Sequence, residues 1–383
     1  MAAPQRKSGA LDHWRFSLDL KNWFNELYIH EDVWDSPVAK RVRDFLSVTA
    51  TPVNQRPYQN LTGPLSGTDF DHSKKRLYLS KHQGHFFRKC PGTHGAACCN
   101  YFVLNLGVQC NMNCSYCYLQ SYINSPLSQI YTNIDEALIE LDGLVARNPR
   151  STFRVGTGET IDSLSLDDLT HYSAILVEWF SRHPQLTCEF KTKSDNVKNF
   201  IDLKHAGNVV VSFSVNPAII VDTEEHRTAS LDSRLAAASL ARDKGFPVAF
   251  HIDPMIYFDQ WEKHYEELVN RLCDQFSADQ IKWVSLGALR YPPDMKHILR
   301  QRFGAQTKSL LGELFLSSDG KLRYDQTLRN KMFQRVVEEF RKRDRRYPVF
   351  LCMESPESWL GTFDRTPRQV ESVANLFKPI PAL

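Results

Sequence analysis

Apolar runs of strand length alternate with amphipathic segments of helical spacing over the central part of the chain. The apolar runs are YFVLNLGV (101–108), TFRV (152–155), TCEFKT (187–192), VVVSFSVN (209–216), PVAFHID (247–253) and IKWVSLGAL (281–289). The amphipathic segments cover residues 133–148, 165–183, 196–207, 231–245 and 260–276. A strand followed by a helix, repeated along the chain, predicts parallel pairing with right-handed crossovers. We therefore predict an α/β fold in which residues 101–289 form a partial (β/α)6 TIM-type barrel, with its chemistry at the C-terminal ends of the strands.

The segments before the barrel are less regular. The run TPVNQRPYQNLTGPLSGT (51–68) is rich in Pro, Gly, Asn and Thr, which indicates an extended or irregular connection. Ahead of it, partly helical spacing with Ser36 before Pro37 as a helix start predicts a small N-terminal element. We assign residues 1–68 to an N-terminal extension and linker, and residues 69–100 to a cysteine-containing lead-in.

The region after the barrel, residues 290–383, has a different pattern. LFLSSDGKLRY (314–324) contains two strand-like runs around an Asp-Gly dipeptide, which favours a tight hairpin turn. Apolar residues at helical spacing then predict a helix over 330–347, whose basic end suits a helix C-terminus. The C-terminal part is therefore expected to be a β-hairpin followed by a helix.

Composition narrows the function classes only modestly. The chain has 383 residues, 42% of them hydrophobic, and carries 47 Lys plus Arg against 44 Asp plus Glu. A net charge of +3 does not by itself indicate a nucleic-acid-binding protein, so any basic surface must be local. The opening MAAPQRKSGALDHW lacks an apolar signal core, and no stretch approaches the roughly 20 apolar residues of a membrane span. We expect a cytoplasmic protein with no membrane partner.

The cysteines are grouped in a way that indicates bound metal or reactive thiols. There are 9, an odd number that does not suit a disulfide framework in a long chain without a secretion signal. Six fall within 28 residues: Cys90, Cys98, Cys99, Cys110, Cys114 and Cys117. The scattered Cys188, Cys273 and Cys352 are expected to be small buried hydrophobic residues.

The stretch LGVQCNMNCSYCYLQ (106–120) places Cys110, Cys114 and Cys117 in C-x3-C-x2-C spacing directly after the first predicted barrel strand. Composition gives roughly 0.005 chance occurrences of this triple in the chain, so accident is a poor explanation. Three thiolates can hold three irons of a [4Fe-4S] cluster and leave the fourth iron for an exogenous ligand. In a radical S-adenosylmethionine (SAM) enzyme that ligand is SAM, whose reductive cleavage gives a 5′-deoxyadenosyl radical. The alternative is a structural zinc site completed by Cys98 or Cys99.

The segment CSYCYLQSYINSPLSQIYTNIDEAL (114–138) resembles the cluster loop and following helix of the spore photoproduct lyase family, radical SAM enzymes that repair a thymine dimer in DNA. The resemblance continues through TKSDNVKNFIDLKHAG, VSFSVN, FPVAFHIDPMIYFDQWEKHY and GKLRY, and covers roughly 27–340. It implies that Cys110, Cys114 and Cys117 are the cluster ligands. It also implies that Tyr116 and Tyr118 lie near the radical and help to return a hydrogen atom to SAM; alternatively, they only pack over the cluster.

The resemblance extends to positions that would bind SAM. The segment VGTGET (155–160) is similar to the glycine-rich segment that holds the methionyl amino group, which gives roles to Gly156, Thr157, Gly158 and Glu159. An ordinary turn is the alternative. Three further positions match SAM contacts, with a surface lysine and loop caps as their alternatives. They are Lys193 for the carboxylate, and Ser214 and Asn216 for the ribose.

On the substrate side, Arg290, Arg323 and Tyr324 match positions that contact lesion and backbone in the family. The hairpin that carries the last two resembles a hairpin that probes DNA. An arginine can bind phosphate and a tyrosine can stack on an extruded base, which fits base flipping. Exposed hairpin residues without a ligand are the alternative.

The resemblance fails at one catalytic position. The family carries a cysteine near the end of the second strand that gives a hydrogen atom to the product radical, whereas this chain has Gly156, Thr157 and Gly158 there. Either another thiol reaches the substrate or the reaction ends differently. The candidate thiols are Cys98, Cys99, Cys90 and Cys352. Cys90, Cys98 and Cys99 are alternatively ligands of a second metal or cluster.

Together these features predict a radical SAM lyase-like enzyme that abstracts hydrogen from a nucleic-acid base. DNA is favoured over RNA, and a pyrimidine photoproduct is the expected lesion. An external electron donor such as flavodoxin or ferredoxin would be required. The rival interpretations are a radical SAM reaction on RNA or on a non-nucleic substrate, and an iron–sulfur protein that binds DNA or senses redox state without turnover.

Overall fold

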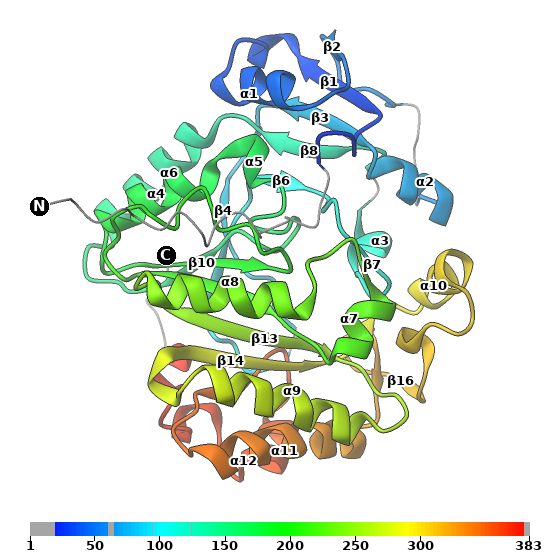
Figure 1. Ribbon diagram of the computed structural model, residues 1–383, viewed down its shortest axis with the longest axis vertical. Coiled ribbons are helices and arrows are strands. Elements are labelled where there is room, and N and C mark those ends of the chain that lie inside the picture. Colours follow the sequence, from blue (N-terminus) through cyan, green and yellow to red (C-terminus); the bar gives the residue numbers. More distant parts are fainter. Residues whose placement is uncertain (1–19, 60–64, 94, 124, 379–383) are drawn as a thin grey trace, which may run out of the picture.

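The computed structural model describes residues 20–59, 65–93, 95–123 and 125–378. Its largest element is an eight-stranded sheet with the order β18-β14-β13-β11-β10-β9-β5-β4 (Figure 1). The strands are β4 (Phe87–Lys89), β5 (Tyr101–Leu104), β9 (Arg154–Gly156), β10 (Thr187–Thr192), β11 (Val209–Ser214), β13 (Val248–Met255), β14 (Ile281–Ala288) and β18 (Val349–Leu351). Six of them, β5 to β14, are parallel neighbours in chain order, so the predicted partial barrel is confirmed. A parallel β18 at one end and an antiparallel β4 at the other were not predicted.

Helices follow most of the barrel strands and cover one side of the curled sheet (Figure 1). They are α4 (Ile134–Arg147), α5 (Asp167–Thr170), α6 (Tyr172–Ser181), α8 (Leu231–Asp243), α9 (Trp261–Gln275) and α11 (Gln326–Arg343). The predicted helix over 196–207 is wrong, because the segment forms turns only. Asn196 and Asn199 explain the difference. Their side-chain amides donate to Leu164 O (3.3 Å) and Asp167 O (3.0 Å), and such bonds hold the chain in turns.

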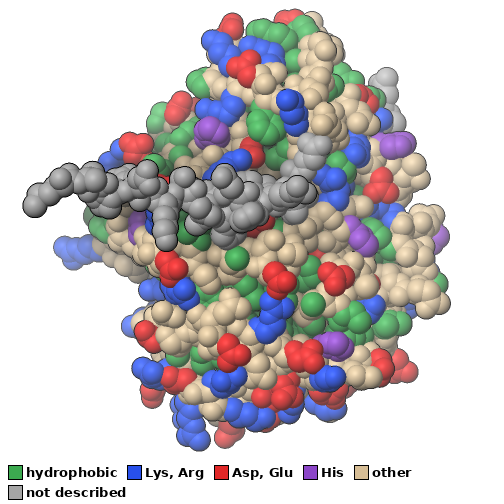
Figure 2. Space-filling model, in the orientation of Figure 1, with side chains coloured by type: hydrophobic (Ala, Val, Ile, Leu, Met, Phe, Trp, Pro, Cys, Tyr) green, Lys and Arg blue, Asp and Glu red, His purple; other side chains and the backbone are tan. Residues whose placement is uncertain are grey.

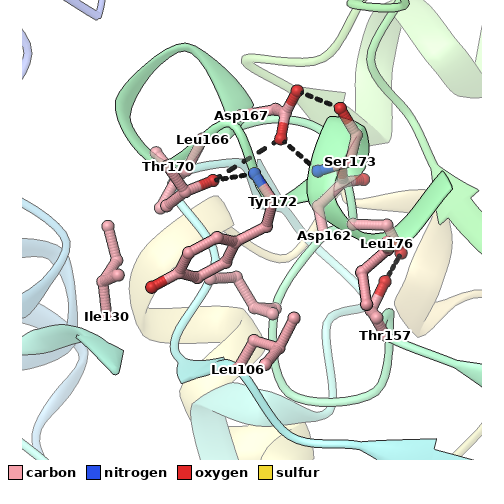
Figure 3. Close-up of a pocket in the computed structure, with 12 residues that line it drawn as sticks. Leu106, Ile130, Thr157, Asp162, Leu166, Asp167, Thr170, Tyr172, Ser173 and Leu176 are labelled. Atoms are coloured by element: carbon pink, nitrogen blue, oxygen red, sulfur yellow. Dashed lines mark hydrogen bonds between the residues drawn. The ribbon is translucent and has the colours of Figure 1, made fainter. Parts of the chain in front are cut away.

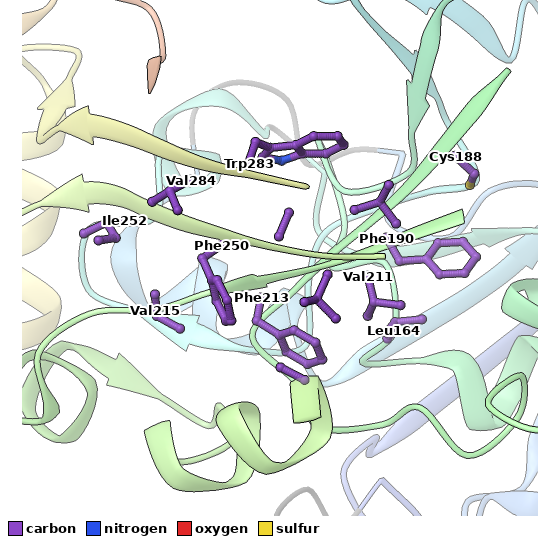
Figure 4. Close-up of a cluster of buried hydrophobic side chains, with 14 of the residues drawn as sticks. Leu164, Cys188, Phe190, Val211, Phe213, Val215, Phe250, Ile252, Trp283 and Val284 are labelled. Carbon is purple, nitrogen blue, oxygen red and sulfur yellow. The ribbon is translucent and has the colours of Figure 1, made fainter. Parts of the chain in front are cut away.

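The main core lies between the barrel sheet and its helices. Figure 4 shows side chains from four neighbouring strands that meet there, among them Phe190, Phe213 and Phe250. Each of these rings is at most 1% exposed, and burying one ring stabilises the fold by about 1.5–3 kcal/mol. Alternate residues of the same strands point into the barrel interior. Cys188 is buried in this core as expected, whereas Cys273 and Cys352 are only partly buried.

A second sheet packs beside the barrel and has the order β2-β1-β3-β8-β6. Its strands are β1 (Glu26–His30), β2 (Ala50–Val53), β3 (Arg76–Ser80), β6 (Gly107–Val108) and β8 (Ser128–Tyr131). The N-terminal part is therefore larger than the small element expected, and β2 overlaps the start of the segment expected to be irregular. Sequence reading missed this sheet because its strands come from both sides of that segment. Helix α1 (Pro37–Phe45) does begin as predicted, since Ser36 Oγ accepts from Ala39 N at 3.2 Å.

The C-terminal part contains the predicted hairpin and helix. Strands β16 (Leu314–Leu316) and β17 (Leu322–Tyr324) pair across a turn in which Gly320 has φ 76°. A third strand, β15 (Arg290–Tyr291), joins them. Helix α11 starts at Gln326, before the predicted start, because Asp325 caps it by accepting from Thr327 N at 2.8 Å. Helix α12 (Pro356–Phe363) follows β18.

The face shown in Figure 2 carries Lys, Arg, Asp and Glu side chains that are interspersed, in keeping with a net charge of +3. Within the described ranges, none of the helices combines the length and apolar character needed to cross a bilayer.

Candidate functional site

The cysteine loop lies beyond the first barrel strand, between β6 and α3 (Leu119–Tyr122). A short antiparallel pair fixes its middle: Cys114 in β7 (Asn113–Cys114) is opposite Glu225 in β12 (Glu225–His226). Gln109, with φ 77°, turns the chain into the loop, and its N–H donates to Thr160 O at 2.9 Å. In Figure 1, β7 and α3 lie beside α7 (Ala218–Glu224), between the barrel and α10 (Met295–Phe303).

A buried lysine lies under this loop. Lys74 is 2% exposed, and its Nζ donates to the carbonyl oxygens of Cys110 (2.7 Å) and Met112 (2.6 Å). Burial lowers the pKa of Lys74, while Cys117, Cys110 and Cys114 oppose this shift, so all three thiols lie within charge-interaction range of one ammonium group. The predicted grouping of the three cysteines is thus present in the fold.

Two of the three thiols, Cys110 and Cys114, are poor anions without a cationic partner. Burial raises the pKa of Cys110 to about 11; nearby Asp162 adds to the rise and Lys74 opposes it. Burial also raises the pKa of Cys114 far above its usual range. Thiolates at such positions are stable when they coordinate a metal, which deprotonates them. The donor set and the buried cation therefore fit three ligands of an iron–sulfur cluster.

A single zinc ion would need its ligands around one point, about 2.3 Å from each sulfur. Among the described residues, no group of three or more His, Cys, Asp or Glu side chains is arranged to hold one metal ion. The ligands of a cubane are not subject to that requirement, because each sulfur binds a different iron.

Glu225 connects the loop to the strand ends. Its buried carboxylate accepts hydrogen bonds from Tyr116 Oη and from Asn216 Nδ2 (3.1 Å). It also forms an ion pair with Arg234 at 2.6 Å in which both side chains are fully buried. Burial raises the pKa of Glu225, but Arg234 and then Lys193 outweigh it, so the pKa lies below the usual value. Three predicted residues, Tyr116, Lys193 and Asn216, therefore meet at a carboxylate that was not predicted.

Glu224, the preceding residue, holds the loop from another side. Its carboxylate accepts from Ser115 Oγ, from Ser309 Oγ (2.9 Å) and from Lys308 N (2.8 Å). Its carbonyl accepts from Ser115 N at 2.7 Å. Sequence reading missed both carboxylates. The available signal was the pair of adjacent Glu residues shortly after the fourth barrel strand, where polar residues collect in this type of fold.

The glycine-rich segment lies next to the loop. A Cβ added to Gly158 would be 2.9 Å from Lys191 O, so a larger residue would push the segment away from β10. Thr157 Oγ1 donates to Ser163 Oγ at 2.8 Å. The carboxylate of Glu159 pairs with Arg88 at 2.7 Å, and its carbonyl accepts from Tyr118 Oη at 2.8 Å. Tyr118 thus links the cysteine loop to this segment, with 41% of its surface exposed.

Two further predicted SAM positions lie nearby. Burial lowers the pKa of Lys193, but Cys114 and then Glu225 outweigh this, so Lys193 stays charged. Its Nζ lies 5.5 Å from the centre of the Tyr116 ring. Ser214 is 3% exposed, and its carbonyl accepts from Arg234 Nη1 at 2.9 Å. Lys193 therefore lies beside the cysteine loop, and Ser214 lies next to the arginine that pairs with Glu225. Their roles toward SAM stay predictions.

The predicted substrate residues have partners within the protein. Arg290 pairs with Asp253 at 3.1 Å, and Arg323, 4% exposed, pairs with Asp319 at 2.7 Å. The ring of Tyr324 is buried, and its Oη accepts from Tyr257 N at 3.0 Å. The alternative that Arg323 and Tyr324 are exposed hairpin residues does not hold, because both are buried, and their predicted contacts with substrate stay predictions.

Cys90, Cys98, Cys99 and Cys352 have different surroundings. Cys99 Sγ accepts from Arg154 Nη2 at 3.1 Å, whereas Cys98 is exposed and accepts from Asn100 N at 3.4 Å. Burial raises the pKa of Cys90, and the charge of Cys352 adds to the rise. Roles for Cys98 and Cys99 in hydrogen transfer stay predictions.

A small cavity lies behind the glycine-rich segment, between it and the α5–α6 turn (Figure 3). Leu106, Thr157 and Tyr172 are among its lining residues, and Asp167 is hydrogen-bonded to Ser173 at its edge. Its volume of about 30 Å³ suits one water molecule and not a nucleoside.

Comparison with known proteins identifies the family. A sequence model described as "Spore photoproduct lyase" matches residues 25–333. The chain is 27% identical over 205 residues to the spore photoproduct lyase of Geobacillus sp. (strain Y412MC61), which covers 53% of this chain and 60% of that protein. It is 29% identical over 172 residues to the spore photoproduct lyase of Bacillus subtilis (strain 168), covering 45% and 50%. The chain thus spans only 50% to 60% of the length of these two relatives.

Solved structures agree on the fold. A mutant spore photoproduct lyase with bound AdoMet and dinucleoside spore photoproduct matches with a TM-score of 0.73 at 20% identity, over 88% of this chain and 99% of that chain. A second mutant matches with a TM-score of 0.74 at 18% identity, over 88% and 99%. The predicted barrel is therefore the fold of these enzymes. Because the family model covers far more than half of its length, the chain belongs to the spore photoproduct lyase family.

Proposed function

We propose that this protein is a radical SAM enzyme that abstracts a hydrogen atom from a nucleic-acid base, with a pyrimidine photoproduct in DNA as its substrate. The grouping of three thiols over the buried Lys74 ammonium, at the end of the barrel, carries this proposal. Membership of the family supports it, as do the AdoMet and the dinucleoside spore photoproduct named in a solved structure of the same fold.

Cys110, Cys114 and Cys117 would hold a [4Fe-4S] cluster. Once bound, the cluster and SAM together supply a 5′-deoxyadenosyl radical. The protein contributes position and charge: Lys74 balances the negative charge of the thiolates from below, and its two hydrogen bonds fix the backbone on which Cys110 lies. An external one-electron donor of the flavodoxin or ferredoxin class would reduce the protein.

SAM would lie between the cysteine loop and the ends of β9, β10 and β11. Gly156 and Gly158 permit a close approach of the backbone, and Lys193 supplies a cation for the SAM carboxylate. Glu159 would bind the SAM ammonium in exchange for, or together with, Arg88. Ser214 and Asn216 lie at the end of β11, where a ribose is expected. Tyr116 and Tyr118 border this space from the loop.

Arg323 and Tyr324 support substrate binding indirectly in this proposal. Arg323 donates to Met353 O (3.2 Å) and pairs with Glu354 (3.5 Å), and Tyr324 Oη accepts from Tyr257 N, so both residues hold the hairpin against segments outside it. Arg290 is opposite Arg323 in the β15–β17 pair and is partly buried at the strand end. Arg323→Ala should weaken binding of a dimer-containing oligonucleotide in a salt-dependent gel shift, because the hairpin loses an anchor.

The first experiment is reductive cleavage of SAM by anaerobically reconstituted protein. The wild type should cleave SAM to 5′-deoxyadenosine and convert a dinucleoside spore photoproduct to thymine nucleosides, and hydrogen abstracted from the photoproduct should appear in the 5′-deoxyadenosine. Cys114→Ala should lose both the iron–sulfur absorbance and the product, whereas the matched control Cys273→Ala, remote from the loop, should retain both. An intact cluster without SAM cleavage would refute an enzyme and favour a sensor. SAM cleavage without repair would refute the substrate.

A further inference from the structure

Inside the barrel, the side chain of Tyr101 lies directly over Gly156. They lie on neighbouring parallel strands, where Tyr101 is opposite Arg154 and Val103 is opposite Gly156. Side chains at 154 and 156 point to the same face of the sheet because they are two residues apart. A Cβ added to Gly156 would overlap the hydroxyl and the ring of Tyr101. The Tyr101 phenol therefore fills the volume that the side chain of any residue larger than glycine would need at position 156.

The Tyr101 hydroxyl makes no hydrogen bond within the part of the chain that the structure describes, and the residue is partly exposed. Its ring is held instead: the Arg154 guanidinium lies 4.9 Å from the Tyr101 ring centre and 4.6 Å from that of Trp283. Burial raises the pKa of Tyr101 well above its usual value, and Glu189 adds to the rise, so the phenol keeps its hydrogen.

The phenol is also close to the segment proposed to bind SAM. Gly156 is the last residue of β9 and the first of the glycine-rich stretch that ends at Glu159. Tyr118 ties that stretch to the cysteine loop through the carbonyl of Glu159. A group over Gly156 therefore borders the space in which the radical would form.

We propose that Tyr101 donates the hydrogen atom that quenches the substrate radical. This role rests on the proposed function. The phenol O–H bond breaks homolytically, a C–H bond forms on the substrate carbon, and a neutral tyrosyl radical remains. One electron from a reduced flavodoxin or ferredoxin type carrier and one proton from water then restore the phenol. A phenol O–H is about as strong as the allylic type of C–H bond formed on a thymine methyl carbon, so the transfer is nearly balanced and reduction of the tyrosyl radical draws it forward, whereas the O–H of Thr157 is too strong.

The geometry can be tested without turnover. Gly156→Ala should lower the melting temperature by about 2–6 °C, because its methyl group overlaps the phenol. The same substitution in a Tyr101→Ala background should have almost no effect on the melting temperature. An equal loss in both backgrounds would show that the phenol does not occupy this space.

The chemical role is tested with Tyr101→Phe, which removes only a hydroxyl that lacks a partner. Tyr347→Phe is the matched control, because its buried hydroxyl donates to Phe276 O far from the barrel opening. With dinucleoside spore photoproduct in D2O, the wild type and the control should form deuterated thymine and a freeze-quenched tyrosyl signal. Tyr101→Phe should still cleave SAM, with KM unchanged, but lose the signal and at least about tenfold of the rate of product formation.

Two failures are distinguishable. Wild-type protein that cleaves no SAM, or repairs no photoproduct, overturns the proposed function and this role with it. Normal repair and normal deuterium transfer by Tyr101→Phe overturn the role of Tyr101 alone and leave the thiols, such as Cys99, as donors.

Discussion

The Glu225–Arg234 pair should be among the most sensitive positions of the molecule. Replacing Glu225 by Gln keeps an oxygen that can accept from Tyr116 and Asn216, but removes the charge opposite Arg234. A broken buried ion pair costs about 3–5 kcal/mol, since it leaves a charge without a partner. Arg234 keeps bonds to Ala229 O (2.9 Å) and Ser214 O (2.9 Å), which disperse part of that charge. We therefore expect a loss near the lower limit, about 3 kcal/mol.

Urea unfolding measures this loss as a shift of the midpoint at constant slope. The matched control is Glu178→Gln, which removes a carboxylate from an exposed pair with Arg182, where the side chains are 76% and 62% exposed. Exposed pairs contribute about 0–1 kcal/mol, so the control midpoint should hardly move. Adding Arg234→Met to Glu225→Gln should recover much of the loss, because no unpaired charge remains. Equal effects of Glu225→Gln and Glu178→Gln would refute the reasoning.

Further outcomes follow from the same contacts. Lys74→Met should reduce the iron bound per chain several-fold, measured after anaerobic reconstitution, whereas the neighbouring Lys75→Met should not, since Lys75 contacts Trp23 and not the loop. Gly158→Ala should raise the dissociation constant for SAM about tenfold in equilibrium dialysis, because its Cβ meets Lys191 O; an unchanged constant would remove the segment from the SAM site. The pKa of Glu189 is about 2, because His251 and Arg154 outweigh burial. The contribution of Glu189 to stability should be complete above pH about 4.5 and vanish toward pH 2. The urea midpoint of the wild type should therefore fall between these pH values by more than the midpoint of Glu189→Gln does.

The barrel was predictable because its signal is local. Most strands from β5 to β14 are short runs rich in apolar and β-branched residues, and most of the helices that follow them repeat an apolar face within a dozen residues. The segment 196–207 shows the limit of that signal. Its helical spacing is real, but Asn196 and Asn199 bind the backbone of residues about thirty positions away, and no local pattern contains that information.

The site was predictable only where motif spacing encodes it. Three cysteines in one loop must lie together, so their grouping followed from the sequence. Glu225 did not follow, because it reaches Cys114 through a strand pair that joins segments more than a hundred residues apart. The burial of Arg323 was not predictable either, because arginine is usually exposed, whereas Arg323 pairs here with Asp319 and Glu354.

These long-range contacts determine how the cysteine loop is held. Lys74 reaches it from the end of α2 (Gly67–Ser73), Glu224 and Glu225 reach it after β11, and Thr160 reaches it after β9. Each contact uses backbone or side-chain groups other than the three thiols. The fold therefore determines the conformation of the loop without a bound cluster. A structural zinc finger lacks such supports and folds only with its metal. The apo protein should therefore keep its unfolding transition near that of the loaded protein. A collapse of the midpoint on removal of iron would show that the cluster shapes the loop.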